Sequence, residues 1–381
     1  MKCIINGKIV TPSEVLENKV IVFDEKIKEI ADTDKVDVSG YEVIDAAGAY
    51  VAPGLIDIHI HGYVGEDTCD GNIEGLEKMA RAITANGVTA FCPTTMTVAK
   101  EQIEKAFDTA RELKNKKEYY GAEVLGINCE GPFINPSKKG AQAEEHILRP
   151  DGKFITDNAD IIKLVTIAPE MDGAAEAIKY ITKNSDVLVS MGHTGATFEE
   201  ANEGIKAGVR HTTHLFNAMT ALMHRNPGVV GAALSNDSVS CELIADTFHV
   251  NKGLFALVAK IKGDKLCLIT DCMRAGGMPD GKYDLGGQDV FVKGIQCLLE
   301  DGTIAGSVLR LNRSVQNIYE NTGLGIAKSF AAASLNPATA IGVADRKGSL
   351  EVGKDADIII VNTNFDIIKT IIGGTTRYEN N

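Results

Sequence analysis

The sequence predicts an α/β protein: a (β/α)8 TIM-like barrel with a small β-sandwich domain formed by both chain termini. Three observations support this. Apolar segments typical of buried strands recur eight times in the middle of the chain, each followed by a helical or loop segment. Both chain ends show alternating apolar and polar residues. No G-x-G-x-x-G follows the first central strand, which disfavours the alternative, a dinucleotide-binding doubly wound sheet.

The two ends of the chain predict one small β domain. The N-terminal segments CIINGKIVTP, KVIVFDEKIKEIA and YEVIDAAGAYVAP alternate between turn signals, as do GSLEVGKDADIIIVN and DIIKTIIGG near the C-terminus. Chain ends commonly lie close together in a fold. We therefore expect residues 1–52 and 345–381 to form this domain.

The middle of the chain, residues 53–344, predicts the barrel. Helical patterns between its strands often end in Gly or Asn, which is a usual helix stop. The segment from about 280 to 306 predicts an inserted β-hairpin. The eight predicted strands are 54–62, 87–96, 123–133, 163–170, 186–195, 210–219, 240–250 and 265–273.

Composition restricts the functional class. The formal net charge is −13 at pH 7, so the basic stripe of a nucleic-acid-binding protein is not expected. No apolar run is long enough for a membrane span, and the start MKCIINGKIVTP does not resemble a signal peptide. Eight scattered cysteines without C-x-x-C indicate reduced thiols in the cytoplasm. We expect a cytoplasmic protein with neither nucleic-acid nor membrane partners.

Histidines cluster at predicted strand ends. His59 and His61 are two apart on the first barrel strand, so both point to the same side and can reach one metal ion. Buried histidines with ordinary hydrogen bonds are the alternative, but the other strand-end groups favour metal binding. In a barrel, all these ends meet at one mouth, where active sites lie.

Three more strand-end residues extend the metal hypothesis. Glu130 could bridge two metals or pair with a cation, while His193 and His214 could be ligands or hydrogen-bonded core residues. Nitrogen and oxygen ligands without thiolate suit one or two divalent ions per chain, Zn²⁺ or Fe²⁺ ahead of Mn²⁺ or Co²⁺.

Asp271 ends the eighth predicted strand, after a mostly apolar run. Its carboxylate is either a structural hydrogen-bond acceptor or a general acid/base. Beside a metal-activated water, the catalytic role is chemically direct.

Nine motifs in order resemble the N-acetylglucosamine-6-phosphate deacetylase family of the amidohydrolase superfamily, from about residue 1 to residue 370. After APGLIDIHIHG they include GYVGEDTCD, CEGPFINPSKKGA, MGHTGA, THLFNAM, RNPGVVGAAL, TDCMRAGGMPDGKYDLGG, IAGS and NPATAIGVADRKGSLEVGKDADIII. The resemblance implies metal-dependent deacetylation of N-acetyl-D-glucosamine 6-phosphate to D-glucosamine 6-phosphate and acetate, in amino-sugar catabolism.

The resemblance also implies roles for individual residues. Glu130, His193 and His214 match metal ligands, and Asp271 matches the catalytic acid/base. Arg225 matches an arginine that reaches into the neighbouring subunit's site to hold the phosphate, which implies a homodimer. The remaining positions that match substrate contacts are Ala141, Gln142, Asn217, Ala218, His249, Ile304, Ala305 and Gly306.

Two features distinguish this chain from many family members. Gln142 stands where many carry a substrate-contacting His, and it cannot carry charge. His146, four residues on, could substitute, although a solvated loop residue is the simpler interpretation. Both His59 and His61 are retained, which permits two metals.

Two other functions stay open. The site could hydrolyse another cyclic or N-acyl amide, or the chain could be a non-catalytic scaffold. Retention of all five candidate ligands and Asp271 disfavours the scaffold.

Overall fold

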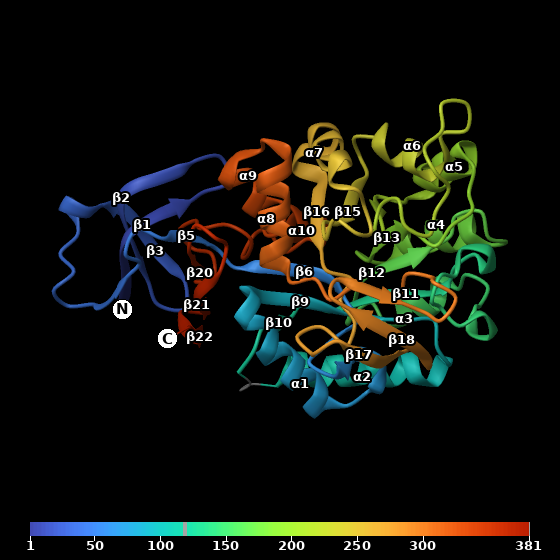
Figure 1. Ribbon diagram of the computed structural model, residues 1–381, viewed down its shortest axis with the longest axis horizontal. Helices are drawn as coiled ribbons and strands as arrows, with labels where there is room; N and C mark the ends of the chain where they lie inside the picture. The colour runs from blue at the N-terminus through green and yellow to red at the C-terminus, as the bar shows by residue number, and fades with distance from the viewer. Residues whose placement is uncertain (117–119, 381) are drawn as a thin grey trace.

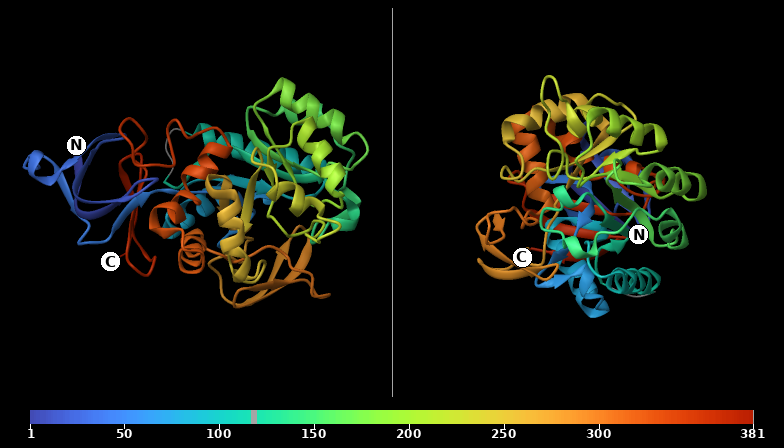
Figure 2. Two further views of the ribbon diagram at one scale, coloured as in Figure 1. Left: turned by 90° about the horizontal axis from the view of Figure 1, so that it is seen from above. Right: turned by 90° about the vertical axis from the view of Figure 1, so that its right-hand side faces the viewer.

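The computed structural model describes residues 1–116 and 120–380. Its larger part is a barrel of eight parallel strands, and its smaller part is a β domain at one end of the molecule (Figure 1). The long axis of the molecule runs through both parts, and the two chain termini lie together in the small domain (Figure 2).

The barrel is nearly closed. Parallel hydrogen bonds connect the second to the eighth barrel strand in order, and the first barrel strand is hydrogen-bonded to the second. A bridge between Ile60 and Cys272 joins the first strand to the segment after the last. The barrel strands are β6 (Leu55–Ile60), β9 (Val88–Thr95), β11 (Ile127–Phe133), β12 (Ile162–Ile167), β13 (Leu188–Met191), β14 (His211–Thr212), β15 (Ser240–Ile244) and β16 (Leu266–Ile269).

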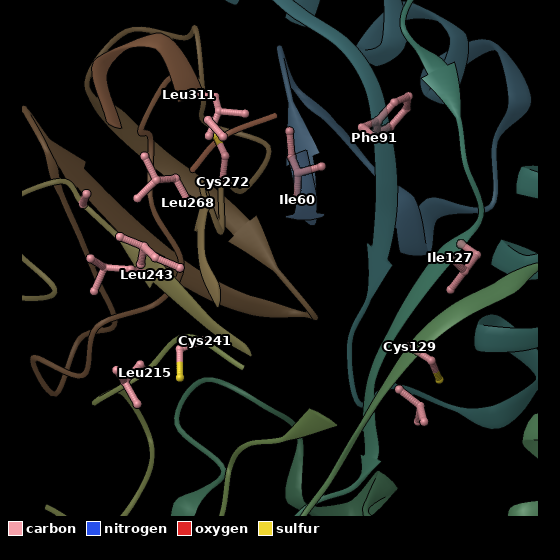
Figure 3. Close-up of a cluster of buried hydrophobic side chains, with 14 of the residues drawn as sticks. Ile60, Phe91, Ile127, Cys129, Leu215, Cys241, Leu243, Leu268, Cys272 and Leu311 are labelled. Carbon is pink, nitrogen blue, oxygen red and sulfur yellow. The ribbon is translucent and has the colours of Figure 1, made fainter. Parts of the chain in front are cut away.

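Helices cover the outside of the barrel. Strand residues alternate between polar positions and the apolar cluster under the helices: on β15, Glu242 belongs to a polar network, while Cys241 and Leu243 belong to the apolar cluster (Figure 3). The helices are α1 (Ile73–Ala82), α2 (Lys100–Asn115), α3 (Gly152–Asp157), α4 (Ala174–Asn184), α5 (Phe198–Ala207), α6 (Gly228–Leu234), α7 (Phe255–Lys262), α8 (Leu311–Thr322), α9 (Gly325–Ala331) and α10 (Leu335–Ala340).

The small domain joins both chain ends, as the sequence predicts. β5 and β20 pair in antiparallel fashion at the junction of the N- and C-terminal strands. Hydrogen bonds connect all eight strands in one mixed sheet. Its strands are β1 (Lys2–Val10), β2 (Val15–Phe23), β3 (Ile27–Asp32), β4 (Glu42–Asp45), β5 (Tyr50–Pro53), β20 (Ile358–Val361), β21 (Ile367–Ile372) and β22 (Thr375–Glu379).

Several shorter strands lie outside the eight barrel strands. β17 (Gly281–Leu285), β18 (Gln288–Lys293) and β19 (Gln296–Leu298) form a three-stranded antiparallel sheet where the sequence predicts a hairpin. The remaining short strands are β7 (Gly62–Tyr63), β8 (Glu66–Asp67) and β10 (Glu123–Val124). None of the helices among the described residues is both long and apolar enough to cross a membrane.

The predicted strand 210–219 is mostly a loop. Only His211 and Thr212 form β14. His214, Phe216 and Ala218 have positive φ angles of 27°, 80° and 50°, which extended strands do not tolerate. The chain therefore turns repeatedly at the mouth of the barrel instead of continuing along it.

Candidate metal centre and substrate pocket

A cavity of about 380 Å³ lies at the carboxyl ends of the barrel strands. Most of the candidate residues line it, together with residues of the loops after β11, β14 and β19. The lining comprises His61, Met96, Glu130, Ser137, Lys138, Gly140, Ala141, Gln142, His193, His214, Asn217, Ala218, His249, Asp271, Leu285, Thr303, Ile304 and Gly306.

One potential ligand group consists of Glu130 on β11, His193 after β13 and His214 after β14. Glu130 Oε1 lies 3.2 Å from His193 Nε2 and 2.9 Å from His214 Nε2. The two imidazole Nε2 atoms are 3.1 Å apart. All three residues are buried, and they line the cavity with their polar atoms close together.

The second group consists of His59 on β6, His61 just after it and Asp271 after β16. Asp271 Oδ1 lies 3.2 Å from His61 Nε2 and 3.5 Å from His59 Nε2, and the two Nε2 atoms are 3.4 Å apart. The two histidines point to one side of β6, as their spacing predicts.

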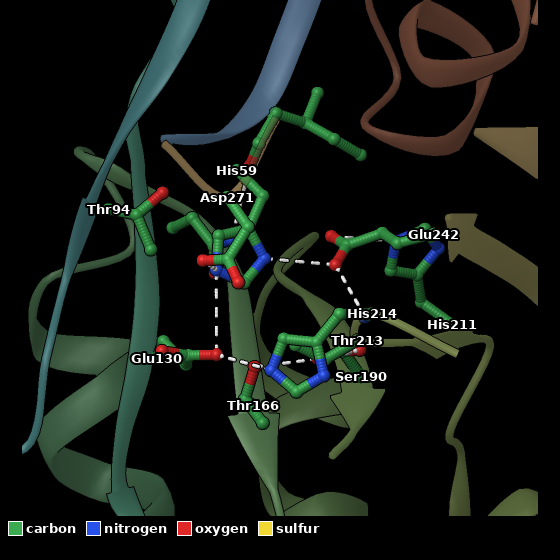
Figure 4. A network of polar contacts seen from close by, with 12 residues as sticks. His59, Thr94, Glu130, Thr166, Ser190, His211, Thr213, His214, Glu242 and Asp271 are labelled. Carbon is green, nitrogen blue, oxygen red and sulfur yellow. Dashed lines mark hydrogen bonds and ion pairs between the residues drawn. The ribbon is translucent and has the colours of Figure 1, made fainter. Parts of the chain in front are cut away.

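Glu130 connects the two groups (Figure 4). Its Oε1 also lies 3.4 Å from His59 Nε2, and its Oε2 lies 3.3 Å from His61 Nε2. One carboxylate therefore faces all four histidines, which is the geometry that a bridging ligand requires.

The donor sets fit divalent metal ions. Nitrogen ligands at about 2.0–2.1 Å from a tetrahedral Zn²⁺ lie about 3.3–3.4 Å from each other, close to the observed Nε2–Nε2 separations of 3.1 and 3.4 Å. Within each group all ligand atoms lie within 4.8 Å of one another. The barrel thus contains two buried His/Asp/Glu groups suited to divalent metals.

The histidines and carboxylates of the site shift one another's pKa values. Burial raises the pKa of Glu130, but His193 and His59 outweigh burial and hold that pKa well below its usual range. The pKa of Asp271 is likewise lowered, because His61 and His59 outweigh burial. Burial lowers the pKa of His59, yet Glu242 and Glu130 outweigh it and raise the pKa to about 9. Carboxylates in the charged form draw positive charge to this point.

Unusual backbone angles present three of these side chains. His193, His214 and Asp271 have φ angles of 45°, 27° and 51°. Such conformations cost about 1–3 kcal/mol each and persist only where the surrounding structure enforces them. Here they occur at residues that end or follow barrel strands, where the chain bends around the cavity.

Three of the four histidines have an acceptor at Nδ1, which leaves Nε2 facing the site. His61 Nδ1 lies 3.3 Å from the Thr94 carbonyl, and His193 Nδ1 lies 2.8 Å from the Lys138 carbonyl. His59 Nδ1 lies 2.9 Å from Glu242 Oε2. Glu242 was not among the residues expected from the sequence, although a carboxylate inside the apolar strand SCELI was a signal for it.

Gln142 contacts the candidate metal centre directly. Its Nε2 donates to Glu130 Oε2 at 2.6 Å, and its Oε1 accepts the Thr97 backbone N–H at 2.5 Å. His146 does not line the metal-site cavity but a neighbouring one, to which Gln142 also belongs. Gln142, rather than His146, therefore occupies the position beside the candidate metal ligands.

The predicted substrate residues divide into two sets. Ala141, Gln142, Asn217, Ala218, His249, Ile304 and Gly306 line the cavity. Ala305 is buried without lining it, and Arg225 is exposed on the loop before α6, outside the lining. His249 Nδ1 lies 2.7 Å from Asp246 Oδ2, so Asp246, which the sequence analysis did not single out, orients this ring.

Comparison with known proteins places these features in a family. The model of the amidohydrolase family matches residues 50–377. The chain is 41% identical to the N-acetylglucosamine-6-phosphate deacetylase of Bacillus subtilis (strain 168), over 97% of this chain and 95% of that protein.

Two solved structures have the same fold along the whole chain. The N-acetylglucosamine-6-phosphate deacetylase of Pasteurella multocida superposes with a TM-score of 0.94 at 33% identity, covering 100% of both chains. A mutant of the Mycobacterium smegmatis N-acetyl-D-glucosamine-6-phosphate deacetylase in complex with N-acetyl-D-glucosamine-6-phosphate has a TM-score of 0.91 at 26% identity, with 99% of each chain covered.

Proposed function

The chain belongs to the amidohydrolase family and, within it, to the N-acetylglucosamine-6-phosphate deacetylases; from this premise we propose how its site works. The reaction is hydrolysis of the acetamide of N-acetyl-D-glucosamine 6-phosphate to D-glucosamine 6-phosphate and acetate. The observation that carries the proposal is the convergence of two metal-ligand groups, bridged by Glu130, with Asp271 in one cavity.

Two divalent ions, Zn²⁺ or Fe²⁺, are the proposed cofactors. Glu130, His193 and His214 would hold one, and His59, His61 and Asp271 the other, with Glu130 bridging. A bound divalent ion supplies Lewis-acid activation of water and of the acetyl carbonyl.

Asp271 moves the proton in this mechanism. As a carboxylate, it accepts a proton from the attacking water while the water oxygen bonds to the acetyl carbon. The same carboxyl group then donates that proton to the amine nitrogen as the C–N bond breaks.

The residues that match substrate contacts would hold the sugar beside Asp271. His249, fixed by Asp246, contributes to phosphate binding, with Asn217 and Ala218 beside it. Ile304 and Gly306 would cover the acetyl group. Gln142 would contact the sugar from its position beside Glu130.

Arg225 would complete the phosphate site of a second subunit in a homodimer. Its exposure on the loop before α6, outside its own cavity, supports a role in trans. Leu222 and Met223 on the same loop are also exposed, at 49% and 57%, and give this loop apolar surface for a subunit contact.

Acetate release tests the substrate. The purified protein is assayed with N-acetylglucosamine 6-phosphate, the unphosphorylated sugar and the 4-epimer, N-acetylgalactosamine 6-phosphate, with metal content measured on the same sample. Release that requires the phosphate supports the proposal. No release from metal-loaded protein refutes this substrate and favours another cyclic or N-acyl amide. Lack of both metal and activity favours a scaffold.

Subunit mixing tests Arg225. Homodimers of Arg225→Ala and of Asp271→Asn are each weakly active, but a hybrid contains one site with neither defect if Arg225 acts in trans. Statistical mixing then restores about a quarter of wild-type activity. If Arg225 acts in cis, every mixture has only the average activity of the two parents.

A cytoplasmic location is proposed from the thiols. All eight cysteines are buried and free, which suits a reducing compartment. Measuring the protein in cell fractions tests this.

A further inference from the structure

Glu242 lies beneath the candidate metal centre and contacts both ligand groups. Its side chain is fully buried. Oε2 lies 2.9 Å from His59 Nδ1 and accepts the backbone N–H of His214 at 3.0 Å (Figure 4). A single oxygen therefore fixes the ring of one ligand and the main chain of another.

A second histidine supports Glu242 from the opposite side. His211 Nε2 lies 3.2 Å from Glu242 Oε1, and His211 Nδ1 lies 2.5 Å from Ser240 Oγ. Ser240 Oγ also donates to the Arg210 carbonyl at 3.2 Å. The hydrogen-bonded chain thus runs from His59 through Glu242 and His211 to the Ser240 hydroxyl at the start of β15, and from there to the backbone carbonyl of Arg210, just before β14.

A buried carboxylate in this position needs a reason. Burying an ionised group costs several kcal/mol, and apolar residues of similar volume often replace buried ion pairs without loss of stability. Both Glu242 oxygens have polar partners, so the charge is compensated, but packing alone does not require it. What the carboxylate adds is a directed acceptor at His59 Nδ1.

We propose that Glu242 is a positioning residue. It orients His59 so that this histidine can bind a metal ion, and His211 holds Glu242 in place. An acceptor at Nδ1 keeps the proton there and leaves the Nε2 lone pair facing His61 and Asp271. The inference rests on the proposed function, because it concerns the second of the two proposed metal ions.

The two metal groups should depend on Glu242 to different extents. In the group of His59, His61 and Asp271, Glu242 controls the orientation of a ligand ring. In the group of Glu130, His193 and His214, it holds only a backbone N–H. Removing the carboxylate should therefore weaken mainly the ion held by His59.

Zinc titration of the metal-free enzyme tests this. Glu242→Gln preserves volume, so the fold should survive, but it replaces the charged carboxylate at His59 Nδ1 by a neutral amide and so weakens the acceptor that orients this ring. We expect the wild type to bind two Zn²⁺ per chain and Glu242→Gln to bind one of them about 10–100-fold more weakly, as loss of an outer-shell partner typically does. His211→Gln should produce a smaller loss of the same ion.

Two controls separate positioning from general destabilisation. Asp357→Asn also removes a buried carboxylate, bonded to Lys347 in the small domain, and should leave both zinc affinities unchanged. In a His59→Gln background, Glu242→Gln should weaken zinc binding no further, because its effect passes through His59. The Co²⁺-loaded Glu242→Gln enzyme should also show an altered visible spectrum.

The outcomes are distinct. Wild-type zinc affinities in Glu242→Gln overturn the inference and leave the proposed function intact. An equally large effect of Glu242→Gln in the His59→Gln background also overturns it, because the residue then acts on the whole site. A wild type that binds only one ion refutes the two-ion part of the proposed function, and the inference with it.

Discussion

Replacing Asp271 by Asn should abolish most turnover while preserving the fold and the group of Glu130, His193 and His214. The change removes the carboxylate that we propose accepts and returns the proton, and general acid–base catalysis contributes about 10²–10⁴-fold. We expect kcat to fall by about that factor and KM to change little, because Asp271 serves the reacting atoms rather than the sugar.

The backbone conformation at Asp271 should tolerate this substitution. Asp271 donates its backbone N–H to the His59 carbonyl at 2.9 Å, and its own carbonyl accepts the Ser307 N–H at 2.8 Å. Its φ of 51° is a conformation that Asn tolerates better than most residues. The side chain is therefore expected to stay in place with an amide oxygen where Oδ1 lies.

Steady-state acetate release and metal analysis on the same protein provide the assay. The ion held by Glu130, His193 and His214 should remain, because Asp271 is not in that group. A kcat within tenfold of the wild type would refute the assignment of the proton transfers to Asp271. Loss of both ions would show instead that the residue maintains the whole centre.

Three further predictions concern stability. Lys347 is only 2% exposed and its Nζ lies 2.6 Å from Asp357, 2.9 Å from Glu123 and 3.2 Å from Asp355. Lys347→Met should cost about 3–5 kcal/mol, because it leaves three carboxylates without their shared cation, and calorimetry should show a fall in Tm of about 4–6 °C; an unchanged Tm would contradict this. Burial raises the pKa of Glu123 and of Asp355, but Arg346 beside the first and Lys347 beside the second outweigh burial and lower both. Since the folded pKa values lie below the unfolded ones, the stabilisation is complete above about pH 5 and is lost as the pH falls through the folded values; denaturant titrations from pH 7 to pH 3 should show a smaller acid loss in Lys347→Met than in the wild type. Chelation should lower Tm, and restoring Zn²⁺ should recover it, because an ion at a thousandfold excess over its Kd raises the free energy of unfolding by about 4 kcal/mol per site. A Tm insensitive to metal would argue against the buried ligand groups as ion sites.

The pattern of apolar and polar residues along the chain was enough to predict the overall architecture of the fold and much of the candidate site. Strand alternation predicted both the barrel and a β domain assembled from the two chain ends. The spacing of His59 and His61 predicted that both face one side, because side chains on a strand repeat every two residues. The position of Asp271 after a short apolar run predicted a carboxylate at the mouth of the barrel.

Other features depend on contacts between residues distant in sequence. The extended segment predicted at 210–219 became a loop, because positive φ angles at His214 and its neighbours turn the chain around the cavity. Gln142 was expected at a substrate-contacting position, and only the structure shows that its amide bonds to Glu130. The single sheet of the small domain likewise results from pairing between strands at opposite ends of the chain.

The sequence by itself determined which residues could be ligands, and only the tertiary structure decided how those residues are held. Glu242 and His59 are separated by 183 positions. Periodicity and propensity describe neighbours along the chain, whereas a buried carboxylate acquires its role from the groups that barrel closure brings within about 3 Å of it. His59 could therefore be predicted from its own strand, but the carboxylate that orients it could be recognised only in the closed barrel.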